Sequence, residues 1–222
     1  MSKPAPLAIP INKQINNDLE GEYKKLLEKH LFGRIIKDDK INSWMDNILA
    51  DAKEYFIKKY PNYDVFLFVF ICPRNLYFRS HNHSISIKGK DWSNVVSLQT
   101  DDLYGCIYFF FYQKYKLDYQ IESYENEIIQ KGGDLLKKYL EDRKYGKELE
   151  NYLKYINEEY SDFILSKNKK LRCFFLSHIY QNPIPGKYYF KYLSHRKNIY
   201  SRFVQTYEND SFNCCHYLFF FK

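Results

Sequence analysis

The chain has 222 residues, a formal net charge of +7 and a hydrophobic content of 45%, which together fit one or two domains with a substantial core. No apolar stretch reaches the ~20 residues that a membrane-spanning helix needs. The opening residues "MSKPAPLAIP" lack the apolar core of a signal peptide. The sequence therefore predicts a soluble intracellular protein.

The positive charge is concentrated toward the C-terminus. Residues 1–114 hold 16 basic and 13 acidic side chains, residues 115–166 hold 8 and 12, and residues 167–222 hold 10 and 2. A basic tail can contact nucleic acid or an acidic surface. A solvated, poorly ordered tail is the simpler interpretation of the same charge.

Two amphipathic helices are predicted near the N-terminus, after a loose arm at residues 1–17. Apolar residues recur at helical spacing from Leu19 to Leu31, and Gly33 can end that helix. A second helix is predicted from about Asp39 to Pro61. Its broad apolar stripe needs a partner surface and contains Ile41, Trp44, Met45, Ile48, Leu49, Ala52, Tyr55 and Phe56.

Four strands are predicted to follow, at about 64–72, 77–88, 94–100 and 103–113. Their short connections favour antiparallel neighbours and thus a four-stranded meander. The first strand, "VFLFVFIC", is apolar on both faces. The second helix can cover one of these faces. A partner subunit or the C-terminal half of the chain must then cover the other.

The second of these strands differs from the others because neither of its faces is cleanly apolar. Long strands with weak patterning are typical of sheet edges, exchanged strands and peptide-docking strands. We therefore identify this strand as the candidate peptide-binding surface or dimer interface. Its residues are Phe78, Arg79, Ser80, His81, Asn82, His83, Ser84, Ile85 and Ser86.

The pattern changes after Lys114. Apolar residues at helical spacing between Ile121 and Phe163 predict an acidic helical extension over residues 115–166. Residues 167–222 show little amphipathic order, and are interpreted as a small subdomain, an unfolded basic tail or the product of a misread gene boundary. The predicted fold class is thus α+β, with two N-terminal helices on a four-stranded antiparallel sheet and a helical C-terminal extension.

Residues 18–114 resemble the Tctex-type dynein light chains. The segment "INSWMDNIL" resembles the start of the family's second helix, and "YDVFLFVFI" resembles its first strand. The segment "IKGKDWS" resembles a turn between its strands, and "LYGCIYFFF" resembles its last strand. Members of the family end soon after that strand, so residues 115–222 lie outside its pattern.

The resemblance implies a non-catalytic adaptor in the cytoplasm, on the cytoskeleton or in the ciliary axoneme. Its partners would be a dynein intermediate chain and a second light chain, in a homodimer or a heterodimer. Binding would proceed by strand addition, in which backbone hydrogen bonds supply affinity and alternate side chains supply specificity. The residues expected to form the structural core are Trp44, Ile48, Phe56, Phe68 and Tyr104.

No signature of an enzyme, cofactor or metal site is present in the sequence. It contains no Walker A, dinucleotide-binding or zinc-protease motif. His81 and His83 share one strand face, but no third ligand lies nearby. The alternative function is binding of nucleic acid or an acidic surface through "KYYFKYLSHRK", whose aromatic and basic residues interleave. Neither a membrane nor nucleic acid is the favoured partner.

Overall fold

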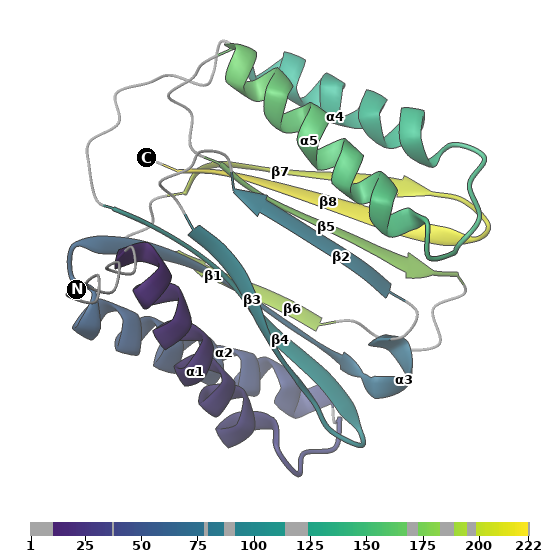
Figure 1. Cartoon of the computed structure of the whole chain (residues 1–222). Coiled ribbons are helices and arrows are strands. Elements are labelled where there is room, and N and C mark those ends of the chain that lie inside the picture. The colour runs from purple at the N-terminus through teal and green to yellow at the C-terminus, as the bar shows by residue number, and fades with distance from the viewer. Residues whose placement is uncertain are drawn as a thin grey trace, which may run out of the picture.

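The fold consists of four layers, with a helical pair on each outer side and two four-stranded sheets between them (Figure 1). The structure is a computed structural model that describes residues 11–36, 38–77, 80–86, 92–113, 124–167, 173–182, 189–194 and 199–221. One outer layer holds α1 (Ile11–Leu31) and α2 (Asp38–Lys59), and the other holds α4 (Glu125–Leu140) and α5 (Leu149–Lys167). Within the described residues, no helix is both long enough and apolar enough to cross a membrane.

The two N-terminal helices pack on a four-stranded antiparallel sheet, as the sequence predicts. This first sheet has the order β3-β4-β1-β6. Its strands are β1 (Tyr63–Pro73), β3 (Trp92–Gln99), β4 (Leu103–Gln113) and β6 (Tyr189–Ser194). Gly33 follows α1 with a φ of +69°, a left-handed conformation that suits a helix-ending glycine.

The predicted meander is wrong in one strand. After β1 and the short helix α3 (Arg74–Tyr77), the chain forms β2 (Ser80–Ser86), which leaves the first sheet and pairs with β5 (Cys173–Gln181). The place expected for it beside β1 is taken by β6. Short connections favour neighbouring strands only on average, and here two strands are exchanged between the sheets.

The predicted helical extension over residues 115–166 contains α4 and α5, but the C-terminal part of the fold is not helical as the predicted fold class has it. The described residues after α5 form β5, β6, β7 (Ile199–Glu208) and β8 (Phe212–Phe221). The second sheet has the order β2-β5-β8-β7 and is antiparallel throughout. Phe174, Phe175, Phe219 and Phe220 are fully buried, because this sheet is covered on both faces. Strands buried in this way have no alternating pattern.

The chain contains an internal repeat, because the succession of two long helices and four strands occurs twice. We call residues 11–113 the first repeat and residues 124–221 the second. A shift of 108 positions carries Phe66 of β1 onto Phe174 of β5 and Ser86 of β2 onto Ser194 of β6, and the pairs Phe66–Ser194 and Phe174–Ser86 are both formed. The two repeats are thus related by an approximate two-fold axis, and each gives one strand to the other's sheet.

Side chains follow the same correspondence. A shift of 109 carries "LYGCIYFFFY" of β4 onto "FNCCHYLFFF" of β8. Ion pairs between the helices are repeated as well: Lys29–Asp51 corresponds to Lys138–Glu159, and Asp18–Lys59 to Glu127–Lys167. The buried residues of α1 that match those of α4 are Leu19, Leu26, Leu27 and Leu31, which correspond to Ile128, Leu135, Leu136 and Leu140.

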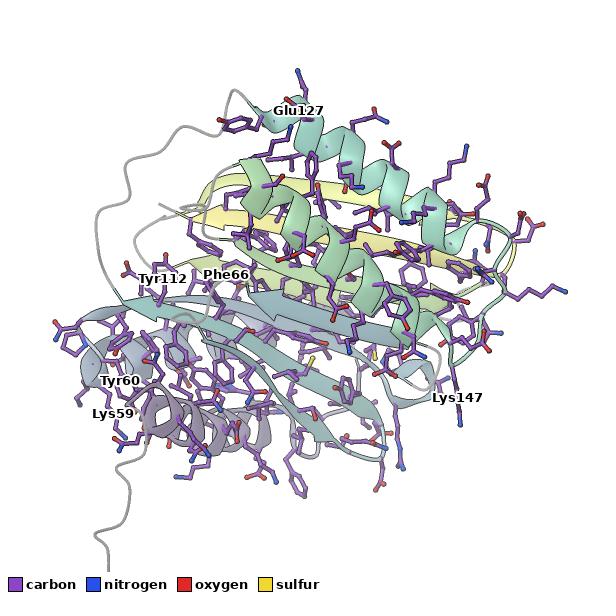
Figure 2. The ribbon with its side chains drawn as sticks, turned by 45° about the horizontal axis from the view of Figure 1, so that its top comes forward. Lys59, Tyr60, Phe66, Tyr112, Glu127 and Lys147 are labelled. Carbon is purple, nitrogen blue, oxygen red and sulfur yellow. The ribbon has the colours of Figure 1, made fainter. Side chains whose placement is uncertain are left out.

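An aromatic core joins the two repeats. The inner face of the first sheet places Phe66 4.5 Å from Phe219, and the equivalent pair Phe110–Phe174 is 5.7 Å apart, measured between ring centroids. Figure 2 labels Phe66 and Tyr112 in this region, and Glu127 on the helical layer above it. The second apolar face of β1 is therefore covered by the C-terminal half of the same chain.

Candidate peptide-docking edges

The predicted binding strand lies at the edge of a sheet. Within the described part of the chain, β2 is hydrogen-bonded to β5 on one side and to no strand on the other, although β3 lies close to that side. Phe78 and Arg79 lie outside the described residues. The seven other predicted residues form β2 and pair along β5 from Ser80–Tyr180 to Ser86–Phe174. A strand with one open side can accept another strand through its backbone.

The hydrogen-bond ladder shows which residues of β2 face outward. The Asn209 N–H donates to the Phe212 carbonyl at 3.1 Å, which fixes the residues of β8 that bond to β7. Bonding direction alternates along an antiparallel strand. The register of β8 and β5 carries this alternation to β2. The backbone N–H and C=O of His83 therefore bond to β5, whereas those of Asn82 and Ser84 point away from β5.

The neighbouring edge, on β3, is partly closed. β3 is next to β2 in space and forms the border of the first sheet. The Val95 N–H, which faces away from β4, donates to Oδ1 of the preceding residue, Asn94, at 2.8 Å. The Val95 side chain is 41% exposed. A local side-chain cap of this kind competes with strand addition at this position of β3.

The predicted core residues lie in two different cores. Ile48 and Phe56 are fully buried between the N-terminal helices and the first sheet. Phe68 and Tyr104 are buried in the aromatic core between the sheets. Trp44 is only partly buried and lies beneath the Arg34 guanidinium, 6.0 Å from the ring centroid. Its burial is therefore less complete than that of the other four.

Sequence reasoning missed β6, which lies inside the segment expected to be a basic tail. Tyr192 packs 5.9 Å from Phe66, and Phe190 stacks on Phe68 at 5.8 Å between ring centroids. These aromatic side chains therefore contact the aromatic core, although Phe190 is still 47% exposed. The signal that could have revealed the second sheet is the repeat of β4 by β8, with Cys and Tyr two positions apart in each.

A buried polar cluster distinguishes the second repeat from the first. The Ser177 hydroxyl donates to Asn157 Oδ1 at 3.0 Å, and its oxygen lies 2.7 Å from His216 Nδ1. His216 is 1% exposed, and its Nε2 has no hydrogen-bond partner. The equivalent positions of the first repeat hold three apolar residues, which are Leu49, Val69 and Ile107.

This cluster predicts acid sensitivity. Burial lowers the pKa of His216 from 6.5 to about 3, so the folded protein holds the neutral imidazole while the unfolded chain takes up a proton below about pH 6.5. The contribution of neutral His216 to the free energy of unfolding is therefore fully present above about pH 6.5. It declines by about 1.4 kcal/mol per pH unit as the pH falls toward 3. Urea unfolding at about pH 7 and pH 5 will measure the loss. A His216→Ile protein with the same acid-induced loss would contradict this origin.

The described residues contain no group of three or more His, Cys, Asp or Glu side chains placed to hold a metal ion. The side chains of His81 and His83 are not among those described. Burial raises the pKa of Cys106 to about 12, which keeps this thiol protonated and weakly nucleophilic at neutral pH.

Neither known protein-family models nor curated proteins include a match to this sequence.

Proposed function

We propose that the chain is a non-catalytic adaptor of the dynein light-chain type. Its first repeat corresponds to the Tctex-like region, residues 18–114, and its second repeat is a further unit of the same architecture. The observation that carries this proposal is β2, an exchanged strand that forms one edge of the second sheet. The partner would be an extended segment of a dynein intermediate chain or of a cargo protein.

Strand addition suits this edge for a physical reason. An added strand bonds through its backbone, so affinity requires only free donors and acceptors on β2, while specificity comes from side chains at alternate positions. The outward-facing residues Asn82 and Ser84 provide the backbone groups. The adjacent border strand β3 exposes Val95, which an apolar side chain of the partner can contact.

The internal repeat takes the role that a second light chain would have in a homodimer. The apolar inner face of the first sheet, which includes Phe66, Phe68 and Phe70, is covered by the second sheet. A partner subunit is therefore not needed to bury it. The chain would act as a single-chain equivalent of a light-chain dimer in the cytoplasm, on the cytoskeleton or in the axoneme.

Proline substitutions in β2 test the proposal. Ser84→Pro and Asn82→Pro remove an outward-facing N–H, so the fold is expected to persist while affinity for a dynein intermediate chain falls tenfold or more. His83→Pro is the matched control, because it removes an inward-facing N–H and is expected to destabilise the pairing with β5 by at least about 1 kcal/mol.

Circular dichroism will report the fold of these three variants, and calorimetry will report their affinity. If folded Asn82→Pro and Ser84→Pro proteins both bind the intermediate chain at full strength, β2 is not the binding edge. If they unfold as readily as His83→Pro, the outward side of β2 is not free.

A further inference from the structure

A groove lies between α2 and β6, at the opposite edge of the first sheet from β3. It has a volume of about 630 Å³. Its apolar surface comes from Leu49, Ala50 and Ile57 of α2 and Leu193 of β6, and Lys53 and Lys58 lie along the helical side. The volume is within the roughly 300–1,000 Å³ range of ligand-binding clefts.

We propose that this groove is a second docking site, for an extended acidic segment of a partner protein. It goes beyond the proposed function, which concerns β2, and uses different residues. The approximate two-fold axis makes β6 the equivalent of β2, so the two strands have the same place in their sheets.

The backbone of β6 can extend the first sheet. The Thr100 N–H donates to the Leu103 carbonyl at 2.9 Å, and bonding direction alternates from this pair through β4 and β1. The backbone N–H and C=O of Lys191 therefore bond to β1, whereas those of Phe190 point away from the sheet edge. Within the described residues, no strand lies beyond β6. A segment added here would run beside β6, with alternate side chains on the two faces of the sheet.

These two faces differ in chemistry. On the face toward the second sheet, Phe190 is 47% exposed and Val204 of β7 is 45% exposed, although both are large apolar side chains. Phe190 rests on Phe68 and Tyr217, at ring-centroid distances of 5.8 and 5.5 Å. This face therefore fits apolar side chains of the added segment.

The helical face fits acidic side chains. Lys191 already pairs with Asp46 at 2.7 Å. By contrast, neither Lys53 nor Lys58 forms an ion pair with any described residue. Glu54 is the other acidic residue of the groove, so the lysines remain in excess there. At the equivalent positions of α5 the chain has Ser161 and Ser166, so this charge belongs to one repeat only.

A second copy of this chain is a poorer occupant. Pairing of β6 with β6 of another copy would bring two sets of Lys53, Lys58 and Lys191 to the same face of one continuous sheet. Like charges facing each other across strands are destabilising. An acidic segment removes that repulsion and forms ion pairs with the same lysines.

Charge reversal tests the site on the full-length protein. The probes are fluorescent peptides with the core Thr-Val-Glu-Val-Glu-Val-Glu-Val-Thr, or with Lys in place of each Glu. Fluorescence anisotropy is expected to show about tenfold tighter binding of the Glu peptide. The double variant Lys53→Glu, Lys58→Glu is expected to reverse this preference. The matched control Lys13→Glu, Lys24→Glu makes the same charge change on the exposed side of α1 and should keep it.

Three outcomes would overturn the site: no binding of either peptide at millimolar concentration, equal binding of both, or a preference that the Lys53, Lys58 reversal leaves unchanged. Asn82→Pro separates this proposal from the function assigned to β2. A Glu-peptide affinity that is lost in Asn82→Pro but not in the lysine variant would assign the peptide to β2. That result would refute only the second site.

Discussion

Ser177→Val is expected to destabilise the protein by about 1–3 kcal/mol, although it replaces a polar core residue with an apolar one. Ser177 Oγ is the hydrogen-bond partner of His216 Nδ1, and a buried donor without a partner carries its full desolvation cost. The triple variant Asn157→Leu, Ser177→Val, His216→Ile places the residues of the first repeat in the second. It is expected to be at least as stable as the natural protein, because it removes the whole polar cluster. Urea unfolding followed by circular dichroism measures both effects.

The first repeat supplies the matched control. Val69→Ser alone places one hydroxyl in the equivalent apolar site of the first repeat. This variant is expected to be less stable, because the hydroxyl has no polar partner there. If the triple variant loses as much stability as the sum of its three single variants, the cluster is not a unit. The surrounding core would then be adapted to those polar residues individually.

Residues 1–114 alone are expected to form a dimer. In this fragment β1 lacks β6, β2 lacks β5, and the aromatic inner face is uncovered. A second copy can provide all three, because its β2 is equivalent to β6. The pairing of Phe66 with Phe174 would become a contact between two Phe66 rings, which keeps the interface apolar. Sedimentation equilibrium will show twice the fragment mass.

Phe66→Asp in the same fragment is the test of that interface. A buried, unpaired carboxylate is strongly unfavourable, so this variant is expected to lose the dimer together with its folded state. A stable, folded monomer of the unmodified fragment would contradict the prediction. It would show that the exchanged strands are not required to complete the first sheet.

The elements that local pattern determines could be predicted from the sequence. The α2 stripe from Ile41 to Phe56 identified a helix, and the observed helix, Asp38–Lys59, ends just before Pro61. The strand predicted at 103–113 has those bounds in the structure. Periodicity and terminating residues are local signals, so a single chain segment carries them.

Strand partners could not be predicted in the same way. The weak patterning of β2 correctly marked it as unusual, but nothing within Ser80–Ser86 specifies β5 as its neighbour. The candidate edge could therefore be identified while its sheet could not. The polar cluster was missed for a related reason, since Asn157, Ser177 and His216 meet only after three distant segments pack together.

The second sheet was missed because its strands lack alternation. β5 and β8 are buried on both faces, and their near-continuous apolar runs are ambiguous between strand, buried helix and unstructured segment. Comparison of the chain with itself removes the ambiguity. The correspondence of Cys106 and Tyr108 with Cys215 and Tyr217 gives the same interval of 109 positions as the α1–α4 match.

The exchange of strands also has a consequence during synthesis on the ribosome. Phe66 of β1 pairs with Ser194, which is made 128 residues later. At about 5–20 residues per second, this is an interval of roughly 6–26 s. Throughout it, the most apolar strand of the first repeat has an open edge and an uncovered face. We expect the yield of folded protein to depend on elongation rate and on chaperones that shield nascent chains, even though the completed molecule buries this strand fully.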